Sequence, residues 1–187
     1  RVYLHYTHFL AVPARPHSLR IATNSRASHI KHPLYISTNH YVDTYSNIVN
    51  PLIRLGDLKK ALEFSKKAID LEPSRPVSHN NYGNLLRKSG FSRSALSSYN
   101  KAIASKPDFA EAHGNLGNVL QELGRLEESF ASFNKAIALK PDFAEAHNNL
   151  GITLQELSRL EDALASYNQA IAVKPDYAEA PVSYTHL

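Results

Sequence analysis

The sequence predicts an all-α fold in which helical hairpins stack into a solenoid, and three observations lead to it. The chain repeats itself at a fixed interval, which equals the distance in sequence from Lys106 to Lys140. Two windows of this length, one beginning at Lys106 and one at Lys140, are identical at 24 positions. Each period contains two apolar patterns with the 3.6-residue spacing of a helix. Each period also reaches a proline, which cannot continue a helix. Two helices and two short turns therefore account for each unit.

The unit that follows Pro107 shows how the letters assign these elements. A first helix is expected to bury the apolar residues Leu116, Val119, Leu120 and Leu123. Gly124 then predicts a turn, because glycine readily adopts left-handed conformations. A second helix is expected to bury Phe130, Phe133, Ala136 and Ile137. Pro141 ends it.

Small residues predict where the two helices of a unit cross closely. They stand at matching places in successive units: Gly83, Gly117 and Gly151 on first helices, and Ala61, Ala95, Ser129 and Ala163 on second helices.

The residues after each proline predict a capping box, in which an Asp oxygen accepts from amides of the first helical turn. The pairs are Asp108 with Glu111, Asp142 with Glu145, and Asp176 with Glu179.

The period divides the chain into an irregular extension (1–41), a degenerate unit (42–75), three regular units (76–109, 110–143, 144–177) and a truncated unit (178–187). In the degenerate unit, Val49 replaces the glycine of the crossing and Ser65 replaces an aromatic residue. Pro51 falls inside its first helix, where proline costs about 3 kcal/mol. We therefore expect that helix to be kinked or frayed.

Neither end of the chain follows the period. Residues 1–41 contain no acidic residue and no glycine. Their composition is similar to that of an organelle transit segment, and disorder or non-native sequence are the alternatives. Pro181, Tyr184 and Thr185 break the last unit, so we expect 181–187 to be non-native. Because the chain has no Met, we expect it to be a fragment.

Composition excludes several classes of function. The absence of Cys excludes disulfides, thiolate metal sites and thiol catalysis. The net charge of +4 comes from residues 1–42, which carry +5, while the remainder carries −1. The repeats therefore lack the basic face of a nucleic-acid binder. No apolar run approaches the ~20 residues of a membrane span, and we expect a cytoplasmic protein without nucleic-acid or membrane partners.

We also expect no cofactor, no metal and no catalytic residue. The glycines are used in turns and crossings, so no phosphate-binding loop is formed. His79, His113 and His147 lie one period apart, and we expect them to pack at helix interfaces instead of sharing a metal ion.

The stretch "AHNNLGITLQELSRLEDALASYNQAIAVKP", which begins at Ala146, resembles a tetratricopeptide repeat, a helix–turn–helix unit of about 34 residues. The residues that carry the resemblance are His147, Leu150, Gly151, Leu154, Ala163, Tyr167, Ala170 and Pro175. The resemblance implies a right-handed superhelix whose first helices line a concave groove. It covers 76–180 strongly and 42–75 weakly.

The resemblance also implies that a row of asparagines faces this groove. The row consists of Asn47, Asn81, Asn115 and Asn149, joined three residues later by Asn50, Asn84 and Asn118. It is similar to the asparagine ladder of O-GlcNAc transferase. An amide both donates and accepts, so such a row suits the backbone of an extended peptide. Alternatively, Asn is simply common at this position of the family.

We therefore expect a protein–protein interaction module that binds an extended peptide or a partner helix. The alternative is the substrate-recruiting arm of a larger glycosyltransferase or sulfotransferase whose catalytic domain lies outside this chain. Acidic chaperone tails are not expected to bind, because the clamp-lysine positions hold Ser46, Asn80, Gly114 and Asn148. The open edge of the last repeat is expected to allow self-association.

Overall fold

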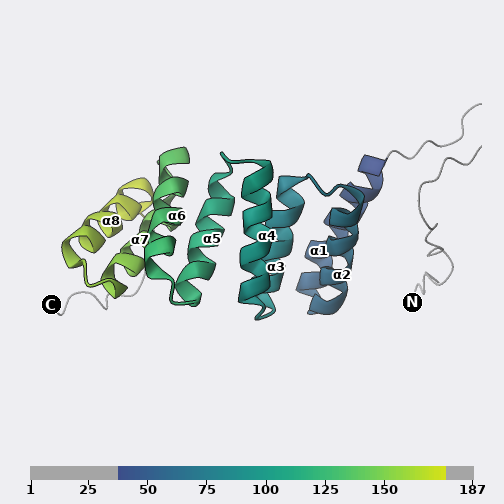
Figure 1. Ribbon diagram of the computed structural model, residues 1–187, viewed down its shortest axis with the longest axis horizontal. Coiled ribbons are helices and arrows are strands. Elements are labelled where there is room, and N and C mark those ends of the chain that lie inside the picture. Colours follow the sequence, from purple (N-terminus) through teal and green to yellow (C-terminus); the bar gives the residue numbers. More distant parts are fainter. Residues whose placement is uncertain (1–37, 176–187) are drawn as a thin grey trace, which may run out of the picture. The chain divides into compact units, whose positions relative to one another are not determined.

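The computed structural model describes residues 38–175, which lie in one compact unit of the chain, Ile36–Leu187. Within residues 38–175 there are eight helices and no strand. They are α1 (Thr38–Arg54), α2 (Leu58–Leu71), α3 (Pro76–Lys88), α4 (Ser92–Ser105), α5 (Ala110–Glu122), α6 (Leu126–Leu139), α7 (Ala144–Glu156) and α8 (Leu160–Val173). Consecutive helices pair into antiparallel hairpins that follow one another in a row (Figure 1). The predicted all-α solenoid is confirmed.

The expectations for residues 1–37 and 176–187 fall outside the described residues, including the capping box of Asp176 with Glu179. The bounds of α1 can be compared with the expected unit boundary. This helix begins at Thr38, so residues 38–41 are helical where we expected irregular chain. No proline or glycine occurs in 38–41, and a helix once formed gains one hydrogen bond for each residue added.

Pro51 lies inside α1, yet the helix continues to Arg54. The fraying expected there is not observed. Pro51 lies in the last turn, where its own carbonyl oxygen still accepts from the Leu55 amide at 3.0 Å. Since only one backbone donor is lost near a helix end, its removal disturbs little of the hydrogen-bond ladder.

The turns within hairpins are built as the glycines predict. Gly56, Gly90 and Gly124 have φ angles of +77°, +82° and +70°. In the last hairpin the same place is taken by Ser158, with φ of +61°. A left-handed conformation is costly for a residue with a Cβ atom, so Ser158 is a strained position.

The predicted close crossings are also present. A Cβ atom on Gly83 would lie 2.6 Å from the ring of Tyr99, and one on Gly117 would lie 2.7 Å from the ring of Phe133. On Gly151 it would lie 2.5 Å from the ring of Tyr167. In these three hairpins an aromatic ring of the second helix therefore rests on the bare backbone of the first.

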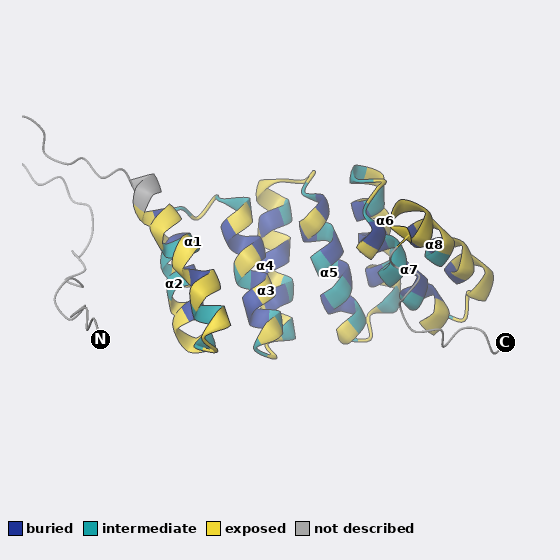
Figure 2. Cartoon of the chain, turned by 180° about the vertical axis from the view of Figure 1, so that it is seen from behind, coloured by how far each residue is buried: buried dark blue, intermediate teal, exposed yellow. Residues whose placement is uncertain are grey.

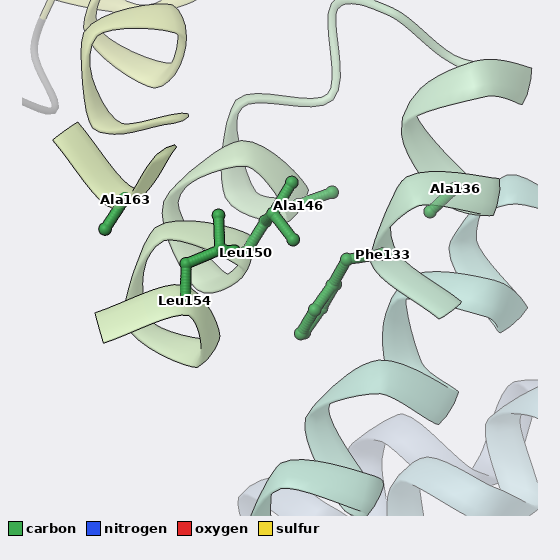
Figure 3. Packing of buried hydrophobic residues seen from close by; sticks show 6 residues of the cluster. All are labelled: Phe133, Ala136, Ala146, Leu150, Leu154 and Ala163. Carbon is green, nitrogen blue, oxygen red and sulfur yellow. The ribbon is translucent and has the colours of Figure 1, made fainter. Parts of the chain in front are cut away.

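The same aromatic rings join one hairpin to the next. Phe133 on α6 is fully buried, and its ring extends toward the side of α7 that carries Ala146, Leu150 and Leu154 (Figure 3). Tyr99 packs with Val119 of α5 in the same way. Each interface between hairpins thus forms its own apolar cluster, as expected when every repeat is covered by its neighbours.

The predicted capping boxes are wrong at the two places that can be examined. Helices α5 and α7 begin at Ala110 and Ala144, with Phe109 and Phe143 at the N-cap and no side-chain cap. The aspartates before them stand one position too early, because a capping oxygen must come from the N-cap residue itself.

Histidines fasten these turns instead. The Nε2–H group of His147 donates to the carbonyl oxygen of Pro141 at 2.9 Å. His113 bonds Pro107 at 3.0 Å, and His79 bonds Pro73 at 2.8 Å. Each bond ties a first helix to the end of the preceding hairpin, which gives the three histidines a structural task at the repeat junctions.

Candidate functional site

From the second hairpin on, the first helices lie closer to one another than the second helices do. Helix α3 contacts α5, and α5 contacts α7, whereas no contact of similar extent joins α4 with α6 or α6 with α8. Closer spacing on one side bends a stack of repeats toward that side. We call the side formed by α1, α3, α5 and α7 the inner face.

The predicted asparagines occupy this face to different degrees. Asn47, Asn81 and Asn84 are exposed, while Asn115, Asn118 and Asn149 are half-buried. Among residues 38–175, the side chains of Asn47 and Asn81 make no hydrogen bond, so their amides are open to solvent.

The half-buried asparagines bond to other asparagines across neighbouring helices. Asn149 Nδ2 donates to Asn118 Oδ1 at 2.8 Å, which links α7 to α5. Asn115 Nδ2 donates to Asn80 Oδ1 at 3.0 Å, which links α5 to α3. Each amide can take part in up to four hydrogen bonds, so these pairs retain donors and acceptors for a ligand.

Asn84 is oriented by a buried tyrosine. The hydroxyl group of Tyr99 donates to Asn84 Oδ1 at 2.8 Å. Burial raises the pKa of Tyr99 to about 12, so the phenol keeps its proton at neutral pH. The bond uses one of the two lone pairs of the Asn84 oxygen and fixes which way its NH₂ group points as a donor.

Sequence reasoning missed two residues of this arrangement, Asn80 and Tyr99. A signal existed for Tyr99. The next unit has Phe133 at the same position, so packing there requires only an aromatic ring. A buried tyrosine hydroxyl in addition needs a hydrogen-bond partner. For Asn80 the signal was weak. The same position holds Asn148 in the last unit, but Ser46 and Gly114 in the two neighbouring units.

Charge on and beside the first helices changes along the array. Arg87 Nη1 pairs with Glu122 Oε1 at 3.2 Å, and Lys140 Nζ pairs with Glu111 Oε1 at 3.4 Å. Glu145 on α7 and Glu156 at its end add negative charge toward the last hairpin. Lys88, at the end of α3, makes no recorded contact with a carboxylate in the described part of the chain. The α1–α3 region is thus the less acidic part.

No group of three or more His, Asp or Glu side chains within residues 38–175 has the arrangement of a metal site. Across the same residues, no helix combines the length and the apolar character needed to cross a membrane.

Comparison with protein families finds the same repeat along most of the described chain. Models described as "Tetratricopeptide repeat" match residues 42–75 and 144–177, and one described as "TPR repeat" matches 83–124 and 117–158. No curated protein sequence matches the chain.

Solved structures resemble the fold at low sequence identity. The crystal structure of MamA matches with a TM-score of 0.67 at 20% identity, over 75% of this chain and 88% of that one. PilF of Pseudomonas aeruginosa matches with a TM-score of 0.68 at 21% identity, over 74% and 63%. The first TPR of Spaghetti (RPAP3), bound to the HSP90 peptide SRMEEVD, matches with a TM-score of 0.62 at 22% identity, over 67% and 99%.

Four findings indicate the same repeat: the helical hairpins, the regular repeat period, the glycine–aromatic crossings and the family matches. The chain belongs to the tetratricopeptide-repeat family.

Proposed function

We propose that this chain is a protein–protein interaction module whose inner face binds an extended peptide segment. The observation that carries the proposal is the row of asparagine amides on consecutive first helices, several of them exposed. An extended peptide presents backbone N–H and C=O groups at regular intervals, and an amide side chain can bond to either. The finer comparison with the asparagine ladder of O-GlcNAc transferase is part of this proposal.

A structurally similar protein supports the class of ligand. The first TPR of Spaghetti is bound to a peptide in its solved structure. A strongly acidic tail is not the expected ligand of this chain, because none of the residues Ser46, Asn80, Gly114 and Asn148 supplies a cation.

A second row of asparagines provides a matched control. Asn100, Asn134 and Asn168 recur with the same period as the inner row, but they are exposed on the second helices α4, α6 and α8. This row therefore matches Asn81, Asn115 and Asn149 in residue type, number and spacing, but it lies on the other helices of the hairpins. A peptide-binding role of the inner face predicts that only the inner row matters.

The experiment selects peptides from a random display library against the parent chain and measures their affinity for two triple variants. We expect N81A/N115A/N149A to lose at least about tenfold in affinity, since each lost hydrogen bond contributes roughly 0.5–1.5 kcal/mol. N100A/N134A/N168A should bind like the parent. Circular dichroism must show both variants folded, because N115A leaves the buried Asn80 amide without its partner. Equal affinity of the parent and both variants would show that the inner row of asparagines does not bind the peptide.

A further inference from the structure

The first hairpin is built differently from the other three at its crossing. In those three, a glycine of the first helix lies under an aromatic ring of the second: Gly83 under Tyr99, Gly117 under Phe133, and Gly151 under Tyr167. In the first hairpin the corresponding residues are Val49 and Ser65, both buried. The larger side chain has moved to α1 and the smaller one to α2. We read this as an exchange of volume across the crossing, not as decay of the repeat.

The exchange is incomplete and leaves a cavity open to the inner face. Valine and serine together carry fewer side-chain atoms than glycine with tyrosine. A pocket of about 250 Å³ lies here between α1, α2 and α3. Its apolar lining consists of Val49, Ile53, Ala68 and Leu85, and its polar lining consists of Ser46, Asn50, Ser65, Ser78, Asn81, Asn84 and Lys88.

Three of the seven polar residues of this lining belong to the proposed peptide-binding row. Asn50, Asn81 and Asn84 are exposed beside the pocket. The Tyr99 hydroxyl donates to the oxygen of Asn84, so the NH₂ group of Asn84 remains available as a donor. A peptide backbone held by these amides would therefore pass over the pocket, and one of its side chains could enter.

Lys88 decides which charge suits the occupant. It is exposed, it lines the pocket, and within residues 38–175 no carboxylate is recorded against it. A cation at the edge of a cavity whose lining includes Val49, Ile53, Ala68 and Leu85 favours an apolar side chain that has an acidic neighbour.

We propose that this pocket is a specificity site for a large aliphatic or aromatic side chain of an extended peptide, next to an acidic residue that pairs with Lys88. The proposal rests on the proposed function of the inner face and adds which peptides it selects. The other hairpins lack such a site, because Tyr99, Phe133 and Tyr167 occupy the equivalent space themselves.

The test uses blocked, fluorescently labelled peptides of the form Gly-Ser-Asp-Xaa-Ser-Gly, where Xaa is Phe, Leu or Ala, and measures anisotropy on the full chain. We expect the Phe and Leu peptides to bind at least about tenfold more tightly than the Ala peptide, because only their side chains are large enough to bury substantial apolar surface in the pocket. The matched variant is Val49→Gly/Ser65→Tyr, which gives the first hairpin the Gly83–Tyr99 arrangement of the second. This variant should fold, and it should bind all three peptides alike.

A second variant, Lys88→Gln, should weaken the Asp-Phe peptide about two- to fivefold at low salt and leave a matching Asn-Phe peptide unchanged. If the parent binds the Phe, Leu and Ala peptides alike, or if Val49→Gly/Ser65→Tyr keeps the preference, the pocket proposal is wrong. In that case library-selected peptides that still depend on Asn81, Asn115 and Asn149 would leave the function of the inner face standing. If neither the designed nor the selected peptides bind, both proposals are overturned.

Discussion

Replacement of Gly117 by alanine should destabilise the protein, although alanine is normally the better helix residue. In an ordinary helix interior the change gains about 0.5–1 kcal/mol. Here the new Cβ would lie 2.7, 2.8 and 2.9 Å from Cε1, Cζ and Cδ1 of Phe133. Favourable carbon contacts lie at about 3.5–4.0 Å, so the ring would have to shift by about 1 Å. Phe133 is fully buried against α7 and has no room to do so.

Overpacking of this kind costs about 1–3 kcal/mol, and we expect a net loss of about 0.5–2 kcal/mol. The assay is urea denaturation followed by circular dichroism at pH 7. Phe133→Val removes all three clashing atoms, so Gly117→Ala in that background should stabilise by its helix propensity alone. Gly114→Ala is the control on the same helix, since its Cβ would come only to 3.0 Å from the rim of the Phe143 ring. A stabilised Gly117→Ala in the parent background would refute the reasoning.

Three further predictions follow from single features. Burial raises the pKa of Tyr99 to about 12, from an ordinary value of 10.0. The unfolded chain therefore loses this proton first, and stability that is complete below about pH 10 should fall by on the order of 2 kcal/mol as pH rises through 12. Alkaline unfolding of Tyr99→Phe should lack this component. Ser158→Gly should raise the free energy of unfolding by about 0.5–1 kcal/mol, because it relieves the left-handed strain; an unchanged or lower urea midpoint would contradict this. Leu164 and Ile171 on α8 are 62% and 42% exposed, and α8 is largely exposed in Figure 2. Sedimentation should show concentration-dependent association that L164E/I171E reduces and that Leu55→Glu, in an exposed turn, leaves unchanged.

The fold could be predicted from the sequence because its signals are local and repeated. Three signals depend only on residues at a fixed distance in the sequence. They are the turn glycines, with φ between +70° and +82°, the prolines after the second helices, and the glycine–aromatic crossings. The constant period then places every unit against the next.

The errors arose where a one-residue offset decides the result. Asp142 stands beside the N-cap and not in it, so its side chain cannot act as the cap that the D-x-x-E pattern suggests. Val49 and Ser65, taken singly, indicated a degenerate repeat. Both are buried and line the same pocket, and from this shared position we infer that one change partly offsets the other.

The candidate site was predicted in outline and not in its bonding. The asparagine row follows from the period, but the pairing of Asn115 with Asn80, and not with Asn81, depends on the lateral offset between α3 and α5. The spacing of residues within one helix does not determine how that helix is offset from its neighbour. Whether this row binds peptides remains a prediction.

The histidine–proline hydrogen bonds allow the separation of neighbouring hairpins to be followed at each junction individually. Because a carbonyl oxygen can only accept, His79, His113 and His147 must each keep the proton on Nε2 when neutral. Separation of two hairpins would release that proton to exchange and let the imidazole change tautomer. Nitrogen chemical shifts of three histidines, one at each junction, would then report the order in which neighbouring hairpins come apart. The chain thus carries its own set of local probes for how a linear protein loses cooperativity.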